Sequence, residues 1–325
     1  MLSLCLYASL IRNSIAQNAG HLSNFAVNKP KLFGPVQKIK QIGRGGFGYV
    51  DKVEDSQKKY YARKTVKNPV NEEYEIMKTL KNDHIVDVFD ATIDKDLFQY
   101  YMDLCQMTSE AYVSRINLLS IYHEFKASQN FEKSFSKYVQ LQKTLYKITN
   151  EIAEALSYLH KNSIAHLDLK PSNIMICDEK FKLIDFGLAI KTSDTLINDK
   201  RIQWTTIRVP EISSESYNPF SVDIFQFGYS LLTLSGLPRP ISYEAHNVLK
   251  HPDSSLSEGL FMEFVQQTML ADPSLRPNAD ALFKLKWLTQ GPNIGNQKEL
   301  ERSFYKDMAK VEGIVAAQDL QSFFD

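Results

Sequence analysis

The stretch that most constrains this chain covers residues 166–187. It begins His-Leu-Asp-Leu-Lys-Pro-Ser-Asn, continues with an apolar run and ends Asp-Phe-Gly. Within the length of one hairpin it combines two acids, Asp168 and Asp185, with the cation Lys170 and the amide Asn173. Phosphoryl transfer uses such groups, because it needs an acceptor for the hydroxyl proton, a cation for the moving charge and oxygen ligands for Mg²⁺. The stretch therefore predicts chemistry on a phosphate group.

Composition sets wide bounds. A chain of 325 residues with 43% apolar content can bury a sizeable core, and its length predicts roughly two domains or lobes. The 38 lysines and arginines balance 38 aspartates and glutamates, so no overall field draws the chain to nucleic acid or to an acidic membrane. Specific sites must therefore decide the function.

The three cysteines, Cys5, Cys105 and Cys177, are widely spaced and contain no CxxC pair. This pattern argues against a disulfide framework or a zinc site and favours a reducing compartment. We therefore expect the cytoplasm or the nucleus.

The N-terminal region is poor in acids, since the first one is Asp51. This bias fits a mitochondrial presequence or a weak signal peptide, although the first dozen residues carry only Arg12 as a cation. We favour a helix that packs one apolar side against the domain, formed by Leu2, Leu6, Leu10 and Ile15. No apolar run approaches the ~20 residues needed to span a bilayer, so no transmembrane segment is expected.

A glycine-rich motif occupies residues 42–50. GxGxxG alone is weak evidence, because dinucleotide-binding folds share the spacing but place a helix after it. Here residues 49–53 and 60–65 read as two strands joined by a polar turn, so the motif lies at the tip of a hairpin. Its glycines let backbone N–H groups approach phosphate oxygens; they are Gly43, Gly45 and Gly48.

The second of these strands ends at Lys64, which we expect to point under the loop, within reach of phosphates. A helix is predicted over residues 72–80, and Glu73 is the candidate partner for Lys64. Glu72 and Glu75 are the alternatives, although a solvated helix face suits them better.

The remaining secondary structure is predicted from shorter patterns. Strands are predicted at 86–89 and 98–102, and residues 103–105 read as a hinge whose backbone would face a flat base. Residues 106–140 read as a helix plus an insertion, and residues 141–162 carry a strong helical stripe. Further helices are predicted at 222–234, 260–270, 279–285 and within 298–325.

The order and spacing of these motifs resemble those of the eukaryotic-type protein kinases over about residues 39–287. The resemblance implies an α+β bilobal fold, with a small β-rich N-lobe that carries one key helix and a larger, mainly helical C-lobe. The implied boundaries are 1–35 for an N-terminal extension, 36–102 for the N-lobe, 103–105 for the hinge, 106–290 for the C-lobe with its insertion at 106–140, and 291–325 for a C-terminal tail.

The resemblance also implies ATP and Mg²⁺ as cofactors and a protein as substrate. Asp168 would accept the substrate proton and Lys170 would steady the γ-phosphate, while Asn173 and Asp185 would bind Mg²⁺. Lys64 would hold the α- and β-phosphates and pair with Glu73. The remaining nucleotide contacts would come from Val50, Ala62 and Met175 around the adenine, Met102 as gatekeeper, and Ile42, Asp103 and Cys105. The apolar members of this set are equally plausible as plain core.

The family scaffold carries over too. Glu211 of the Val-Pro-Glu segment should form a buried ion pair with Arg276, and Asp223 resembles the aspartate that ties down the catalytic loop. An apolar column would align the lobes through Met77, Val88, His166 and Phe186.

Three departures from the family pattern bear on regulation and substrate. Leu167 replaces the usual arginine that receives an activation-loop phosphate, so we hypothesise that activity needs no phosphorylation by that route. The Gly-Thr pair that usually precedes the Pro-Glu segment has no clear counterpart in residues 204–208. The sequence therefore leaves substrate recognition there open. Ser172 replaces an acidic residue, so no basic consensus is expected.

Lys170 favours a serine or threonine acceptor. One alternative is a Wee-type cell-cycle kinase, whose similar loop acts on tyrosine. A pseudokinase or scaffold is disfavoured because Lys64, Asp168, Asn173 and Asp185 are all present. A small-molecule kinase is disfavoured by the Pro-Glu segment and its scaffold partners. The oligomeric state is left open by the sequence.

Overall fold

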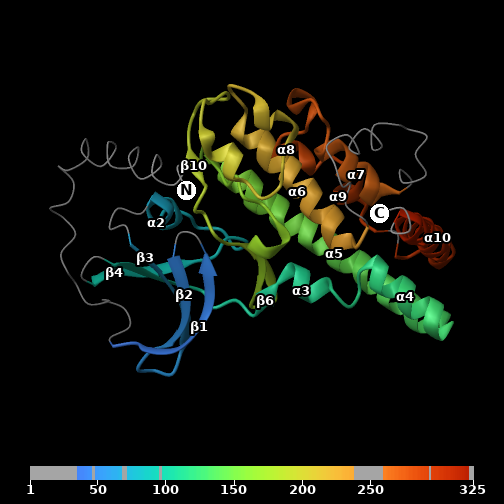
Figure 1. Cartoon of the computed structure of the whole chain (residues 1–325), viewed down its shortest axis with the longest axis horizontal. Helices are drawn as coiled ribbons and strands as arrows, with labels where there is room; N and C mark the ends of the chain where they lie inside the picture. Colours follow the sequence, from blue (N-terminus) through green and yellow to red (C-terminus); the bar gives the residue numbers. More distant parts are fainter. Residues whose placement is uncertain are drawn as a thin grey trace. The chain divides into compact units, whose positions relative to one another are not determined.

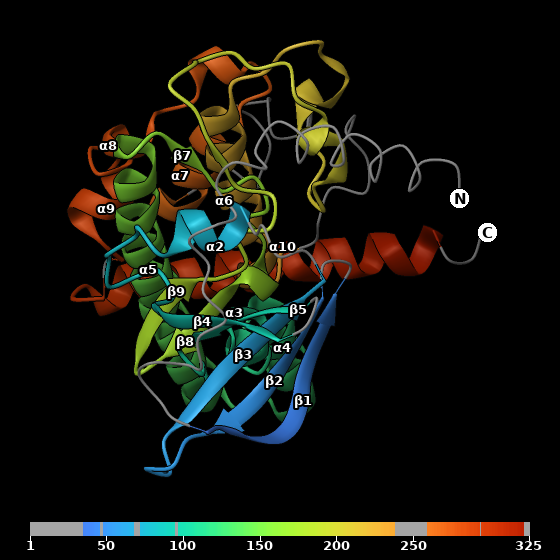
Figure 2. The ribbon, with the colours of Figure 1, turned by 90° about the vertical axis from the view of Figure 1, so that its left-hand side faces the viewer.

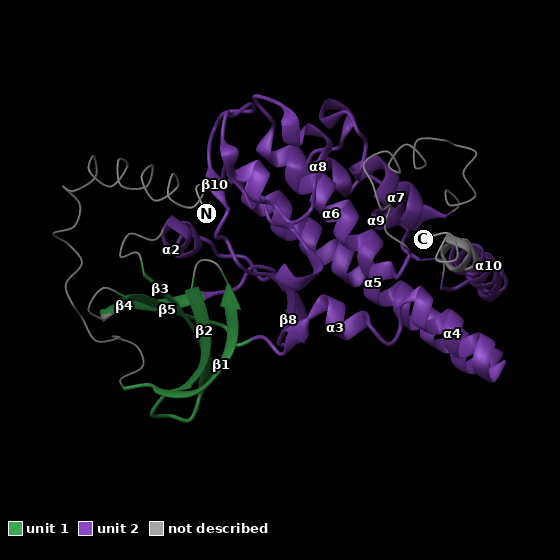
Figure 3. Cartoon of the chain, viewed as in Figure 1, with its two compact units in different colours: residues 1–71, 88–104 green, residues 72–87, 105–325 purple. Residues whose placement is uncertain are grey.

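The structure is a computed structural model that describes residues 35–45, 48–67, 72–94, 97–237, 259–292 and 294–321. The chain divides into two compact units (Figure 3). Unit 1 comprises residues 1–71 and 88–104, and unit 2 comprises residues 72–87 and 105–325. The predicted N-terminal helix lies outside the described residues.

Unit 1 is built on a five-stranded antiparallel sheet with the strand order β1-β2-β3-β5-β4 (Figure 2). Its strands are β1 (Gln37–Gly45), β2 (Gly48–Glu54), β3 (Tyr60–Val66), β4 (Val88–Asp94) and β5 (Leu97–Met102). The polar turn between β2 and β3 is organised by Asp55, whose Oδ1 accepts the N–H groups of Gln57 and Lys59 at 2.8 and 2.9 Å. An aspartate that bonds to the backbone just after it is a common turn-former. The predicted hairpin is confirmed.

The helix α2 (Glu72–Met77) is shorter than the predicted helix over 72–80 and belongs to unit 2. The reason is visible in the segment that follows it. Val86 N donates to Leu183 O at 3.0 Å, and Leu183 N donates to His84 O at 2.9 Å, which joins this segment to β9 (Lys180–Leu183). The predicted N-lobe over residues 36–102 includes this helix, whereas the division into compact units assigns it to unit 2.

Two long helices form the centre of unit 2. The predicted stripe along α5 (Phe131–Lys161) is buried: its seven apolar residues are at most 1% exposed, namely Leu141, Leu145, Ile148, Ile152, Ala155, Leu156 and Leu159. The helix begins at Phe131, ahead of the predicted start, where Asn130 caps it. Beside it, α6 (Pro219–Ser235) begins after Asn218, whose Oδ1 accepts two N–H groups of the first turn.

A close approach of α6 to α7 (Leu260–Thr268) requires a glycine. A Cβ on Gly228 would lie 2.1 Å from Thr268 Oγ1, so any larger residue would push the helices apart. The shorter elements of unit 2 include β7 (Ile164–Ala165), β8 (Ile174–Cys177), β10 (Ile190–Lys191), α8 (Ala279–Leu282) and α9 (Lys286–Gln290).

The region over 106–140 forms regular structure, namely β6 (Met107–Thr108), α3 (Ser109–Val113), α4 (Leu118–Ser128) and the start of α5. The C-terminal segment forms one long helix, α10 (Gln297–Gln321), which packs against α4 and α5 (Figure 1). Phe304 of α10 is fully buried, with its ring 5.4 to 5.6 Å from those of Phe125, Phe131 and Tyr138. None of the helices that the structure describes is long and apolar enough to cross a membrane.

One prediction from the sequence is wrong. Cys105 and Cys177 form a disulfide, with their Cα atoms 4.3 Å apart across a separation of 72 residues. The pairing of β6 with β8 brings the two cysteines together, and Gln106 N donates to Ile176 O at 2.8 Å beside them. Spacing alone cannot reveal a pair made by strand pairing. The argument from the cysteines for a reducing compartment therefore no longer holds.

Candidate active site

The catalytic loop is anchored by Asp223 of α6, which is fully buried. Its two carboxylate oxygens accept the backbone N–H groups of His166 at 2.8 Å and Leu167 at 2.7 Å. The same carboxylate lies 2.9 Å from His160 Nε2 at the end of α5. Several hydrogen bonds to one buried group fix the start of the loop, as the sequence predicted for Asp223.

Two further anchors on α6 were not predicted. Gln226 Oε1 accepts Leu169 N at 3.0 Å and its Nε2 donates to Leu167 O at 3.1 Å, while Ser230 Oγ donates to Leu169 O at 3.3 Å. Leu167 has a left-handed backbone with φ of 62°, a conformation that a leucine adopts only when its surroundings hold it. A signal was present in the sequence, since Asp223, Gln226 and Ser230 recur at helical spacing along a mostly apolar helix.

The predicted catalytic residues come together around Asp168. Lys170 Nζ lies 2.6 Å from Asp168 Oδ2, and Asn173 Nδ2 donates to Asp168 O at 2.8 Å and to its Oδ2 at 3.1 Å. The short helix η2 (Pro171–Asn173) turns the chain back so that these side chains meet. An acid, a cation and an amide therefore share one small volume.

Thr206 joins this group, although no clear threonine motif marks it in the sequence. Its hydroxyl oxygen lies 3.4 Å from Asp168 Oδ1 and accepts a hydrogen bond from Lys170 Nζ at 3.2 Å. Thr206 is 38 residues from Asp168 in the chain, so only the path of the intervening segment brings them together.

The two predicted metal ligands lie on either side of a strand hairpin. Asn173 precedes β8 and Asp185 follows β9, and Ile184 N donates to Asn173 O at 3.0 Å. Because Asn173 Nδ2 faces Asp168, its amide oxygen is the atom left to bind a cation. Oxygen donors of this kind fit a hard divalent cation such as Mg²⁺. Within the described ranges, no group of three or more His, Cys, Asp or Glu residues is placed to hold a metal.

The sheet of unit 1 aligns the predicted nucleotide-binding residues. Val50 is paired with Gly43 on one side and with Lys64 on the other, and Ala62 is paired with Met102. Lys64 is buried despite its charge, at 8% exposure.

Glycine stands at residues 48 and 45 of the loop for different reasons. A Cβ on Gly48, whose φ is 155°, would come within 2.2 Å of Thr65 O, so the fold itself demands glycine there. A Cβ on Gly45 would meet no atom of the described chain within 4 Å. Packing does not require a glycine at residue 45, which is consistent with a role in backbone approach to a ligand. Ile42 is 45% exposed on the same strand.

The other predicted nucleotide contacts are distributed over both units. Asp103 follows β5 in unit 1, whereas Glu73, Cys105 and Met175 belong to unit 2. Glu73 is buried on α2 at 6% exposure, Met175 lies in β8, and Cys105 is held by its disulfide. The pairing of Lys64 with Glu73 stays a prediction.

Comparison with known families identifies the domain that contains these residues. Residues 36–288 match the model of the protein kinase domain. The chain belongs to the protein kinase family. The predicted protein kinase, with its α+β bilobal class, is therefore confirmed.

Several curated kinases are similar to this one. It is 25% identical over 285 residues to the "Probable serine/threonine-protein kinase mkcB" of Dictyostelium discoideum, covering 82% of this chain and 37% of that protein. It is 26% identical to "Mitogen-activated protein kinase kinase kinase A" of the same organism, over 76% of this chain and 27% of that protein. It is 25% identical to "Serine/threonine-protein kinase PLK1" of Xenopus laevis, over 77% of this chain and 42% of that protein. The chain thus spans less than half the length of these relatives. The Wee-type similarity weighed from the sequence is not shown.

The activation segment of this kinase is held by backbone and side-chain contacts. β10 pairs with β7, and residues Ile197 and Tyr217 exchange two backbone hydrogen bonds of 3.0 Å. Arg201 Nη1 donates to Ala189 O at 2.8 Å, and its Nη2 donates to Glu72 of α2 at 3.2 Å. Arg201 thus joins the segment to α2 within unit 2.

The predicted ion pair of the kinase scaffold forms. Arg276 donates to both carboxylate oxygens of Glu211 at 2.7 and 2.8 Å, and its guanidinium lies 4.8 Å from the Phe225 ring centroid. The two charged side chains are 0% and 5% exposed. Part of the predicted apolar column is present in unit 2, where the rings of His166 and Phe186 lie 4.8 Å apart.

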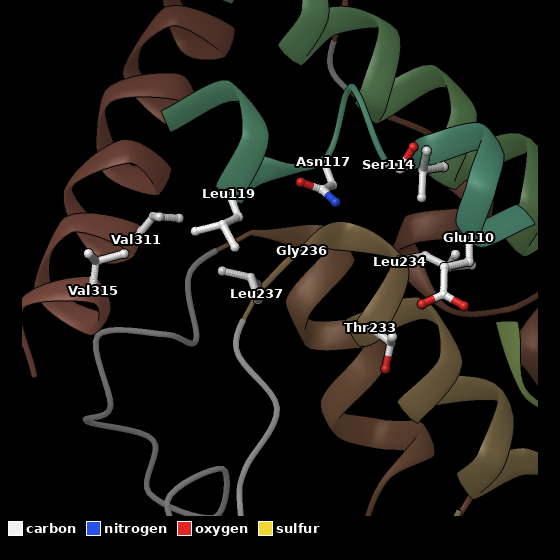
Figure 4. A pocket seen from close by; sticks show the side chains of 11 residues that line it. Glu110, Ser114, Asn117, Leu119, Thr233, Leu234, Gly236, Leu237, Val311 and Val315 are labelled. Atoms are coloured by element: carbon white, nitrogen blue, oxygen red, sulfur yellow. The ribbon is translucent and has the colours of Figure 1, made fainter. Parts of the chain in front are cut away.

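A cavity of about 330 Å³ lies elsewhere in unit 2, beside α3, the end of α6 and α10 (Figure 4). Its lining includes Leu119, Leu234, Leu237 and Val311, and it contains none of the catalytic residues.

Proposed function

We propose that this kinase transfers the γ-phosphoryl group of Mg-ATP to serine or threonine side chains of proteins. The observation that carries the proposal is the cluster of Asp168, Lys170 and Thr206, in which a carboxylate, an ammonium group and a hydroxyl lie within 3.4 Å of one another. A short hydroxyl acceptor that approached Asp168 would find both a proton acceptor and a cation there.

The roles of the residues follow from their chemistry. Asp168 would orient the acceptor hydroxyl and take its proton, and Lys170 would stabilise the charge that develops on the transferred group. Asn173 and Asp185 would hold the metal, while Lys64, supported by Glu73, would hold the phosphates. When bound, Mg-ATP supplies the phosphoryl group and the cation that neutralises its charge.

The same cluster favours a serine or threonine acceptor, although a Wee-type kinase shares this loop and acts on tyrosine. Lys170 is the loop cation typical of Ser/Thr kinases, and Thr206 adds a contact that positions it. The names of the relatives point the same way, since two of them are serine/threonine kinases by name.

Activity without activation-loop phosphorylation is the second part of the proposal. Leu167 is fully buried and supplies no cation for a phosphate. Arg201 instead joins the unmodified segment to Glu72 and Ala189. A segment already held by such contacts has less need of a phosphate to order it.

The activity is tested with a peptide array and Mg-ATP, comparing the wild type with Asp168→Ala. We expect phosphoserine and phosphothreonine from the wild type and none from the variant. Phosphotyrosine alone would instead support the Wee-like alternative, and no signal on any peptide would support a scaffold role.

Activation is tested on enzyme that has been treated with phosphatase. We expect the treated enzyme, and a Thr192→Ala/Thr195→Ala variant, to keep most of the wild-type kcat/KM. Thr205 and Thr206 are not useful here, because Thr205 bonds to buried carbonyls and Thr206 touches Asp168. Loss of activity in the treated enzyme, restored by rephosphorylation, would contradict the idea.

Location stays a proposal as well. An enzyme that consumes ATP needs a compartment that contains it, which is consistent with the cytoplasm or nucleus and also with the mitochondrial alternative. Fluorescent fusions with and without residues 1–35 separate these cases, since a presequence would redirect only the fusion that contains it.

A further inference from the structure

The segment that carries Thr206 has two faces. Thr205, Ile207 and Val209 are buried, at 3%, 7% and 1% exposure. The alternate residues Trp204, Thr206 and Arg208 are exposed. The backbone is extended at Thr205 and Val209, with φ and ψ of −65° and 141° and of −97° and 155°, and it bends at Thr206 and Ile207 between them.

Residues two apart in a chain lie at most about 7 Å apart between Cα atoms. Arg208 is therefore close to Thr206, whose hydroxyl contacts the catalytic Asp168 and Lys170, and both residues are exposed. This places a guanidinium group beside the position where an acceptor would bind.

Arg208 makes little use of its charge within the chain. Its Nη1 donates one hydrogen bond, to Gln203 O at 3.4 Å. Over the described ranges, no carboxylate pairs with it, whereas Arg201 pairs with both Asp199 and Glu72. A guanidinium on this face can thus bind a ligand without giving up an ion pair.

Nearby acids are already occupied. Glu211 is buried against Arg276, and Asp168 is bonded to Lys170 and Asn173. Ser172 of the catalytic loop is exposed but uncharged. Arg208 is thus an exposed cation near Thr206, and neither Glu211 nor Asp168 is free to pair with a basic side chain.

We propose that Arg208 selects substrates that carry an anionic side chain within about two positions of the acceptor, the distance that matches its spacing from Thr206. The inference rests on the proposed Ser/Thr kinase function. Carboxylates and phosphates both fit a guanidinium, which can bind either through two parallel hydrogen bonds. An acidic residue and a previously phosphorylated residue are thus the two sources of the same chemistry.

The test is a positional scan of serine peptides that carry Asp, phosphoserine, Lys or Ala at each position from three before to three after the acceptor. For the wild type we expect kcat/KM to rise by roughly 3- to 10-fold for an anion at one or two positions, the size expected of one charge-assisted contact. The Asp and phosphoserine arms show which source is preferred. No phosphorylation of any peptide would overturn the proposed function itself, whereas equal rates for Asp, Lys and Ala at every position would overturn this inference alone.

Substitutions of Arg208 test whether this residue causes the anion preference. In Arg208→Gln the ratio of kcat/KM for the anionic peptide to that for the Ala peptide should fall toward one, and in Arg208→Glu the Lys peptide should become the better substrate. Arg302→Gln is the matched control, since it removes an exposed arginine from α10 and should leave the ratio unchanged. An anion preference that persists in Arg208→Gln would overturn the assignment to Arg208. Where one variant fails to fold, the wild-type scan still tests the anion preference and the other variant tests its assignment to Arg208.

Discussion

Asp223 shows how one residue can determine the geometry of a catalytic loop. It lies on a rigid helix, and its carboxylate faces two backbone N–H groups and a histidine ring nitrogen. The loop it holds contains Leu167 in a left-handed conformation. The hydrogen bonds from the helix offset the cost of this conformation, so Asp168 is positioned by a residue 55 positions away in the chain.

We therefore expect Asp223→Asn to lower kcat. An asparagine keeps one acceptor but turns an N–H₂ group toward a backbone N–H, which moves the loop, and small displacements of a catalytic group cost about 100-fold. Steady-state kinetics on the best peptide measure the change, and Ser230→Ala is the milder control, since it removes only the hydroxyl contacts to Leu169 O at 3.3 Å and Gln226 O at 2.8 Å. A kcat for Asp223→Asn close to that of the control would contradict this role.

The ion pair of Glu211 and Arg276 predicts a loss of stability when it is broken. Glu211→Gln leaves a buried guanidinium without its counter-charge, which should cost about 3–5 kcal/mol in the free energy of unfolding. Denaturant titration gives the value.

The exposed pair of Lys58 and Glu54 is the control. Lys58 is 80% exposed there, so Lys58→Ala should cost less than about 1 kcal/mol. Similar costs for the two substitutions would argue against a special role for the buried pair.

At the scale of elements, the pairing of β6 with β8 closes a long loop that the disulfide between Cys105 and Cys177 also closes. A crosslink over 72 residues removes freedom from the unfolded chain, an effect of about 2–4 kcal/mol in typical proteins. The linker before α3 is thus held to β8 by both covalent and hydrogen bonds.

We expect a reductant to lower the melting temperature of the wild type but not that of Cys177→Ser. Thermal unfolding with and without dithiothreitol measures this, and thiol labelling under denaturing conditions counts the free cysteines. Full labelling of Cys105 and Cys177 in the untreated protein would contradict the disulfide.

The helix α10 is joined to α5 by a polar contact within an aromatic cluster. Tyr138 donates to Asp307 at 2.7 Å, and Asp307 is 20% exposed and 3.7 Å from Lys310. Burial raises the pKa of the Asp307 carboxyl, and the bonds from Tyr138 and Lys310 oppose this only in part. The charged form is therefore disfavoured in the folded state.

The raised pKa of Asp307 determines how the stability of the fold changes with pH. A carboxyl with a raised pKa in the folded state binds its proton more tightly there, so its contribution to stability is present at low pH and is lost as the pH rises through the folded pKa. Asp307→Asn removes this effect. The melting temperature of the variant minus that of the wild type should therefore increase as the pH is raised from the acid range to neutrality. A difference that does not change with pH would contradict the raised pKa.

At the scale of the whole molecule, the proposed nucleotide roles fall on both units, with Lys64 in unit 1 and Asp185 in unit 2. A ligand that binds only the folded protein raises its apparent stability, by about 2.7 kcal/mol at a hundred times its Kd. Mg-ATP should therefore raise the melting temperature of the wild type.

We expect Lys64→Met and Asp185→Asn each to reduce this shift, and Asp185→Asn to remove most of its dependence on Mg²⁺. Arg302→Gln serves again as the control on an exposed surface. A full Mg²⁺-dependent shift in both variants would contradict the proposed roles.

Much of the kinase was predictable from the sequence because its signals are local. The spacing from Asp168 through Asn173 forces three side chains into one short turn, and the glycines of residues 43–48 are followed by strand-forming residues that exclude a helix. The apolar stripe along α5 and the turn at Asp55 likewise depend on residues that are close in the sequence. Such features follow from backbone geometry and need no knowledge of distant contacts.

Tertiary structure alone decided the features that join distant residues. Thr206 reaches Asp168, Gln226 reaches Leu169, Arg201 reaches Glu72 and Cys105 reaches Cys177 across 38 to 129 positions. Each contact depends on how the chain folds back on itself, and no spacing rule encodes that path. The sequence by itself determined which reactive groups this kinase has, whereas the tertiary structure decided which groups hold them in place.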